Sequence, residues 1–312
     1  MSKKTPLIDY ANEAVPPVPA DIEPVKAERV ASLTSDAWRD LRRNPMFLIS
    51  GALIAGLLLI SVWPGLITSG DPYNGGFCNL SDSLKRPSGA HWFGADLQGC
   101  DIYTRTVHAT SNSIIVGALT SLLVGLVGGL LGLVSGLYSG WIDGVLSRIT
   151  EVFFALPLLI AGLLVLSIFQ IGNVWSVSLV MAAFGWPQIF RIMRGAVITG
   201  KNNDYVMAAK GLGASTLRIA TRHVLPNAVA PVIVIMTINL GVYITAEASL
   251  SYLGIGIQPP DISWGLMISD AQSRFLQSPH ALLFPAAALS ITVLAFIMLG
   301  DAVRDALDPK LR

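Results

Sequence analysis

Six long apolar segments constrain the fold of this 312-residue chain more than any other feature. A helix needs roughly 20 apolar residues to cross the hydrocarbon core of a bilayer. The segments that reach this length are Phe47–Thr68, Ser113–Tyr138, Thr150–Phe169, Val174–Ile192, Val229–Leu250 and Ala281–Leu299. Apolar and polar residues do not alternate within them, so the sequence predicts helices rather than barrel strands. The expected fold class is an all-α integral membrane protein with six transmembrane helices.

The composition excludes soluble classes of protein. Charged residues make up 13% of the chain and hydrophobic residues 53%, whereas a soluble domain carries about 25% charged residues. The formal net charge of +1 gives no reason to expect a nucleic-acid partner. The partner that the composition does predict is the lipid bilayer.

The distribution of lysine and arginine predicts how the helices are oriented. With the N-terminus in the cytoplasm, seventeen of the 21 Lys and Arg residues fall in cytoplasmic segments. The four that fall outside are Lys85, Arg86, Arg105 and Arg274. Cytoplasmic loops of membrane proteins carry an excess of Lys and Arg, so the sequence predicts that both termini are cytoplasmic.

The chain divides into three parts. Residues 1–34 are rich in Pro, Glu and Lys and are predicted to form a disordered cytoplasmic arm. Residues 35–46 are predicted to form an interfacial helix, with an unstructured basic stretch as the alternative. Residues 47–312 form the expected six-helix domain, with an outer loop at 69–112 and a cytoplasmic loop at 193–228.

The cytoplasmic loop 193–228 carries strong local signals for helices. Asn203 or Asp204 can cap a helix that runs to Lys210, and Gly211 and Gly213 would end it. Ser215 can cap a second helix, and Pro226 would then start the fifth membrane helix. The sequence therefore predicts a helix–turn–helix on the cytoplasmic face, and such an exposed unit suits the docking of a soluble partner.

The same loop resembles a known family. Ala208-Ala209, then Gly213, then Leu225-Pro226 are spaced as in the cytoplasmic loop of permease subunits of ABC importers. Met207 stands where the family motif has Glu, which removes a carboxylate from the contact with the ATPase.

Three further regions extend the resemblance to about residues 36–312. The outer loop contains His91-Trp-Phe-Gly-Ala-Asp-Leu-Gln-Gly-Cys-Asp101. Further on, the sequence reads Ser249-Leu-Ser-Tyr-Leu-Gly-Ile-Gly256, and the tail reads Leu299-Gly-Asp-Ala-Val-Arg-Asp-Ala-Leu-Asp-Pro309. These segments are similar to the second (C-type) permease of the dipeptide, oligopeptide and nickel branch. The resemblance implies a type I ABC importer permease fold in the inner membrane of a prokaryote.

The resemblance also implies partners. It implies a second homologous permease, two ATP-binding subunits that carry ATP and Mg, and an extracytoplasmic peptide-binding protein. This chain is expected to bind no cofactor or metal and to hold no catalytic residue. The residues expected to couple it to the ATPase are Asp204, Met207, Ala208, Ala209, Lys210, Gly213, Leu225 and Pro226.

Two polar side chains inside the predicted fifth helix are candidates for a translocation pathway. Glu247 is a carboxylate well within a predicted span, and Asn239 lies on roughly the same face. An ionisable group inside a membrane helix is by default a functional hypothesis. Because Glu247 lies near the outer end of its helix, the alternative is a hydrogen-bonded structural carboxylate.

Cys78 and Cys100 are the two cysteines of the chain, and the predicted topology places both in the outer loop. The extracytoplasmic side is oxidising, so a disulfide is expected. A metal site that adds His91 and Asp101 is the alternative.

Glycines recur every four residues at Gly128, Gly132, Gly136 and Gly140. Such a strip lets another helix backbone approach closely. We expect it to pack within the subunit, with a subunit interface as the alternative.

Other functions remain open at this point. The same fold could import nickel or another small solute. A stand-alone secondary transporter is a second alternative, although inverted repeats and charged, broken helices are not evident. An intramembrane enzyme is disfavoured because no nucleophile–base pair lies within the spans.

Overall fold

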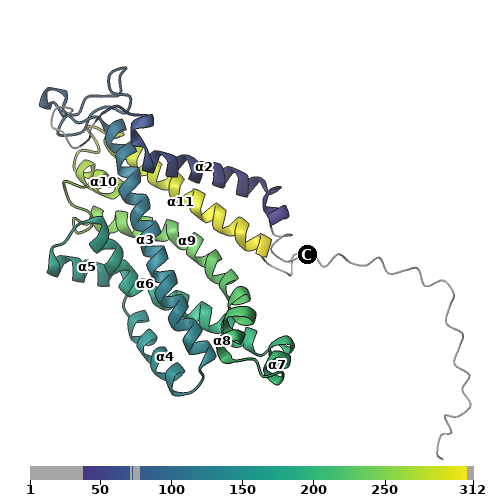
Figure 1. Cartoon of the computed structure of the whole chain (residues 1–312). Coiled ribbons are helices and arrows are strands. Elements are labelled where there is room, and N and C mark those ends of the chain that lie inside the picture. The colour runs from purple at the N-terminus through teal and green to yellow at the C-terminus, as the bar shows by residue number, and fades with distance from the viewer. Residues whose placement is uncertain (1–37, 71, 73–77, 308–312) are drawn as a thin grey trace, which may run out of the picture.

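The computed structural model describes residues 38–70, 72 and 78–307, and within them it is helical and contains no strand (Figure 1). Its main helices are α2 (Pro45–Val62), α3 (Ile102–Leu137), α4 (Trp141–Phe154), α5 (Leu158–Phe169), α6 (Val174–Lys201), α7 (Asp204–Gly211), α8 (Thr216–Ile219), α9 (Leu225–Tyr252), α10 (Trp264–Gln272) and α11 (His280–Leu307). The predicted arm 1–34 lies outside the described residues. Of the predicted interfacial helix 35–46, residues 38–41 are helical, and Trp38 packs edge-on against Phe47 of α2.

Five helices of the described part are long and apolar enough to span a membrane: α2, α3, α6, α11 and the run Thr216–Tyr252 that contains α9. The third predicted segment, Thr150–Phe169, is not one helix. It is divided between α4 and α5, which meet at an angle of 79°. Pro157 precedes α5 and lacks an N–H group, and a residue that precedes proline avoids the helical conformation. Taken together, α4 and α5 pass the same test, either as a broken sixth span or as a re-entrant loop.

The boundaries of several helices also differ from the prediction: α2 ends at Val62 rather than Thr68, and α11 continues to Leu307 rather than ending at Leu299. Helix α3 begins at Ile102 rather than Ser113, and α6 continues to Lys201 rather than ending at Ile192. The second helix of the cytoplasmic loop is not separate, because α8 continues through a π-helical turn at Ala220–Val224 into α9. Such a turn shifts the hydrogen-bond register, which relieves the clash between the Pro226 ring and the preceding turn.

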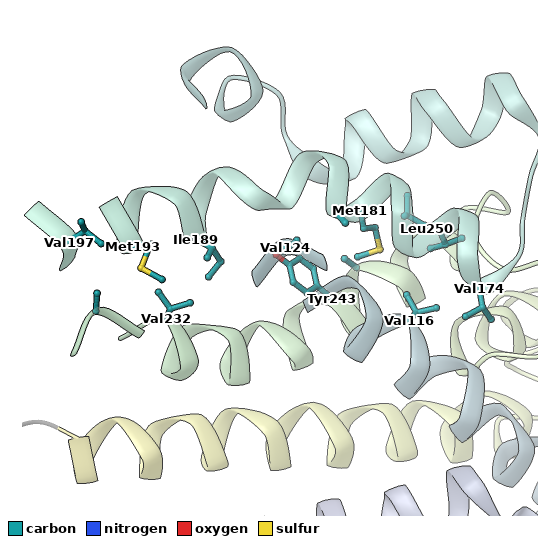
Figure 2. Packing of buried hydrophobic residues seen from close by; sticks show 14 of the residues in the cluster. Val116, Val124, Val174, Met181, Ile189, Met193, Val197, Val232, Tyr243 and Leu250 are labelled. Carbon is teal, nitrogen blue, oxygen red and sulfur yellow. The ribbon is translucent and has the colours of Figure 1, made fainter. Parts of the chain in front are cut away.

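Helices α3, α6 and α9 enclose the main core. Figure 2 shows Ile189 and Met193 of α6 and Val232 of α9 pointing into the space between these two helices. Val124 of α3 and Tyr243 of α9 extend this core toward the middle of the bundle. A second cluster, which includes Trp264 of α10 and Phe296 of α11, joins α2, α10 and α11 to it.

The glycine strip of α3 faces α6 of the same subunit. A Cβ atom on Gly128 would lie 2.6 Å from the Trp186 carbonyl oxygen, and one on Gly132 would lie 2.6 Å from that of Phe190. A Cβ atom on Gly136 would meet Val197 at 2.6 Å. The expectation of packing within the subunit is confirmed for these three positions, since the two backbones approach too closely for any side chain.

An ion pair joins α4 to the end of α6. Arg194 donates from Nε to Asp143 Oδ1 at 2.5 Å and from Nη2 to Oδ2 at 2.7 Å, and Ser135 of α3 also donates to Oδ1. Lys201 donates to the Gly136 carbonyl oxygen at 2.7 Å and to the Ser139 hydroxyl at 2.8 Å. These bonds connect the C-terminal part of α6 to the α3–α4 turn.

We expect Asp143→Asn to lower the free energy of unfolding in detergent by about 2 kcal/mol, because it leaves the half-buried Arg194 guanidinium without its charge partner. Glu151→Gln is the matched control, since the Arg148–Glu151 pair is exposed and such pairs contribute about 0–1 kcal/mol. Thermal unfolding of the two variants measures the difference. Equal stability in both would contradict a role for Asp143 in joining α4 to α6.

Candidate functional site: an exposed helical loop and a hollow between helices

Helix α7 is the central element of the loop between α6 and α9. It begins at Asp204 after the N-cap residue Asn203, and it ends at Gly211. Gly213 follows with a φ of +82°, a left-handed conformation that glycine adopts without steric cost. The Ser215 hydroxyl then accepts a hydrogen bond from the Arg218 N–H at 3.4 Å and so caps α8. The predicted helix and its capping residues therefore lie where the local signals placed them.

The loop is attached to the start of α9. Val206 is buried and belongs to the main core. The neighbouring Tyr205 hydroxyl accepts a hydrogen bond from Asn227 Nδ2 at 3.2 Å, and its ring lies beside that of His223 at 6.3 Å. Helix α7 is therefore attached to the main core through Val206 and to α9 through the Tyr205–Asn227 hydrogen bond.

The outward surface of the loop is apolar at its tip. Three side chains, which we call the docking tip, are exposed there: Met207 (63%), Leu212 (90%) and Leu217 (74%). Asp204, Ala208, Lys210, Gly213 and Pro226 are also exposed, while Ala209 and Leu225 are half-buried. The exposed bases Lys210, Arg218 and Arg222 are near the tip in sequence. A surface of this kind suits a partner groove with an apolar floor and an acidic rim.

A hollow of about 320 Å³ lies where the α4–α5 break meets α6 and α9. It is lined by Phe153, Phe154, Leu156, Pro157, Leu158, Phe184, Gly185, Pro187, Gln188, Asn239, Val242 and Tyr243. Inside it, Asn239 Nδ2 donates to Gln188 Oε1 at 3.0 Å. Of the two sequence candidates for a pathway, Asn239 therefore lies on the wall of this hollow.

Glu247 lies elsewhere. Its side chain is fully buried, and Oε1 accepts hydrogen bonds from Ser251 at 2.6 Å and from Ser263 at 2.8 Å. Ser263 is the N-cap residue of α10, so this carboxylate joins α9 to α10. Glu247 is not among the residues that line the hollow.

Cys78 and Cys100 form a disulfide in the loop before α3. Asp101 next to it caps α3 by accepting from the Thr104 N–H at 2.8 Å. His91 Nδ1 lies 3.1 Å from Asp101 Oδ1, and Arg105 pairs with Asp96. No group of three or more His, Cys, Asp or Glu side chains within the described ranges is arranged to hold a metal ion.

Sequence reasoning missed two features of the site. Gln188 lines the hollow opposite Asn239, and Asp143 pairs with Arg194 51 positions further along the chain. Nothing in the sequence pattern marks Asp143 as the partner of Arg194. The hydrophobic stretch that contains Gln188 reads as an ordinary membrane helix, although a lone amide in it is a recognisable signal.

Residues 128–312 match the family described as "Binding-protein-dependent transport system inner membrane component". Residues 32–87 match the "N-terminal TM domain of oligopeptide transport permease C". The chain belongs to this family and is a multi-pass permease subunit of an ABC transporter of the inner membrane.

Individual relatives place it in the dipeptide and oligopeptide branch. The chain is 38% identical over 289 residues to the glutathione transport system permease protein GsiD of Salmonella typhimurium, which covers 92% of this chain and 94% of that protein. It is 35% identical over 288 residues to the GsiD of Escherichia coli O157:H7, with the same coverage. The resemblance drawn from the loop motifs is thereby confirmed.

Proposed function

We propose that this chain is the transmembrane subunit of an ATP-driven importer that moves di- and oligopeptides across the cytoplasmic membrane. The observation that carries the proposal is the docking tip, an apolar surface outside the spans and attached to α9. Apolar side chains so exposed on a membrane protein's polar face mark a protein interface. The relatives are named as permeases of a glutathione transport system, and glutathione is a peptide, which supports a peptide as the cargo.

The partners follow from the family. A second homologous permease completes the pathway, two ATP-binding subunits hold ATP and Mg, and an extracytoplasmic binding protein delivers the peptide. The loop 204–226 docks on an ATP-binding subunit, with Met207 in apolar contact where other members carry Glu. Both termini lie in the cytoplasm, as the excess of Lys and Arg on that side supports.

The mechanism rests on the attachment of α7. Closure of the ATP-binding subunits displaces the docking tip, and Val206 and Tyr205 transmit the displacement to α9. Because α9 packs on α3 and α6, the displacement rotates these helices as a body. The hollow with Gln188 and Asn239 forms this subunit's share of the pathway, where the amides hydrogen-bond the peptide backbone.

Deletion of the chain in its own organism tests the proposal. ATP-dependent uptake of labelled glutathione and of labelled dipeptides should fall to background for at least one of these probes and return when the wild-type chain is supplied. Uptake of an unrelated sugar serves as the control. Unchanged uptake of every peptide would contradict a role in peptide import.

We infer that Glu247 holds α10 against α9 and does not contact the cargo. Glu247→Gln retains the oxygen that accepts from Ser251 and Ser263, so we expect unchanged substrate preference and uptake within about twofold of wild type. Glu247→Ala removes that acceptor and should lower the thermal stability. Competition among peptides of different charge measures the substrate preference. A changed preference in Glu247→Gln would show that Glu247 does contact the cargo.

A further inference from the structure

Three basic side chains lie in the C-terminal half of α6, and two of them have structural partners. Arg194 is neutralised by Asp143, and Lys201 donates to a carbonyl and a hydroxyl of the α3–α4 turn. Arg191 differs from both. Its guanidinium carbon lies 4.0 Å from the centroid of the Phe154 ring, and no carboxylate of the described residues pairs with it.

Arg191 lies at the edge of the hollow. It follows Gln188 by less than one turn of α6, and Phe154, over which it lies, lines the hollow. Since α6 runs toward α7, Arg191 is on the α7 side of the two amides. Arg191 itself is exposed and is one of the residues counted on the cytoplasmic side, so its guanidinium is accessible at that end of the hollow. A guanidinium that lies over an aromatic ring and has no carboxylate partner among the described residues keeps its hydrogen-bond donors for an anionic ligand.

The chemistry of this edge suits a carboxylate. A guanidinium binds a carboxylate through two parallel hydrogen bonds, which are stronger than its contact with an aromatic face. Gln188 uses Oε1 to accept from Asn239, which leaves its Nε2 hydrogens for a ligand. We propose that Arg191, aided by Gln188, binds the carboxylate of the transported peptide at the α7 end of the hollow. This inference rests on the proposed peptide importer and adds a charge-selective site to it.

A charge-rescue experiment tests this site. The two cysteines of the chain are joined in a disulfide, so Arg191→Cys introduces its one free thiol. The complete complex, with partner permease, ATP-binding subunits and binding protein, is reconstituted in phosphatidylcholine vesicles, which contain no anionic headgroup. The thiol is then modified with an aminoethyl group, which restores a positive charge, or with a methylthio group, which does not. The wild-type complex is treated in the same way.

We expect Arg191→Cys to reduce the uptake of glutathione and of a dipeptide about tenfold, equivalent to about 1.4 kcal/mol. The aminoethyl group should restore uptake to within about threefold of wild type, while the methylthio group should not. Arg148→Cys is the matched control, because Arg148 is an exposed cation of α4 paired with Glu151. It should transport like wild type before and after modification.

Uptake by Arg191→Cys at the wild-type level would overturn the proposal that Arg191 binds the peptide carboxylate. Equal uptake after the aminoethyl and methylthio modifications would overturn it as well. If Arg191→Cys does not assemble with its partners, the pair Arg191→Lys and Arg191→Gln decides. The proposal requires more uptake by Arg191→Lys, which keeps the positive charge, than by Arg191→Gln, and equal uptake by the two variants contradicts it. Absence of peptide uptake by the wild-type complex would instead contradict the proposed function. A defect seen in vesicles with anionic lipid but not in phosphatidylcholine would show that Arg191 binds an anionic lipid headgroup and not the peptide.

Discussion

Replacing Gly213 with valine is expected to abolish ATP-driven uptake and to release the ATP-binding subunits while the membrane helices stay folded. Gly213 has a φ of +82°, and a β-branched residue strongly disfavours this conformation. The turn after α7 would have to change, which would move Leu212 and Leu217 of the docking tip apart. Because no atom lies within 4 Å of the Cβ position, the effect arises from the backbone and not from crowding inside the subunit.

Gly211→Ala is the matched control for this prediction. Gly211 is two residues away and is also exposed, and no atom lies within 4 Å of its Cβ position. Unlike Gly213, it lies in a helical conformation at the end of α7. Alanine there should leave uptake and co-purification of the ATP-binding subunits within about twofold of wild type. Normal uptake and normal retention of these subunits by Gly213→Val would show that the shape of the α7–α8 turn is not needed for docking.

Replacing Gly132 with alanine is expected to destabilise the protein by about 3 kcal/mol, the largest loss that we predict for a single methyl group. The new Cβ atom would lie 2.6 Å from the Phe190 carbonyl oxygen and 2.8 Å from Met193 Cβ. Neither atom can rotate away, so α3 and α6 must separate along the main core. Thermal unfolding in detergent and the amount of protein in the membrane measure this loss.

Gly129→Ala provides the comparison within the same helix. Its nearest neighbour is the terminal methyl group of Met193 at 3.8 Å, an ordinary contact with a flexible side chain. Alanine also has the higher helix propensity, so Gly129→Ala should be neutral or slightly stabilising. Similar stability of the two variants would mean that α3 and α6 do not approach as closely as the structure places them.

Features that depend on neighbouring residues could be predicted from the sequence. Gly213 and Ser215 act on the backbone within a few positions, and the end of α7 and the start of α8 agree with them. Asn203 is the N-cap residue of α7, although its side chain makes no capping hydrogen bond. The length and polarity of the spans are also local properties, and five of the six segments correspond to long helices. In these cases the physical cause lies within the segment itself.

Features that depend on distant parts of the chain could not be predicted. Pro157 indicates a bend, but the angle of 79° depends on how α4 and α5 pack on other helices. The sequence places Asn239 and Glu247 on one face of a helix, yet one lines the hollow and the other is covered by α10. Glu247 is covered because Ser263, the N-cap residue of α10, donates to it, and no local pattern fixes where Ser263 lies.

The central claim is that the loop 204–226 couples this permease to ATP-binding subunits. The most direct test is to purify the tagged chain from its native membrane in mild detergent and to identify by mass spectrometry what co-purifies. Our account predicts a second permease and ATP-binding subunits with the wild-type chain, and loss of the ATP-binding subunits alone with Gly213→Val. A chain that is isolated alone or as a homodimer, even after cross-linking, would contradict the claim and would favour a stand-alone transporter.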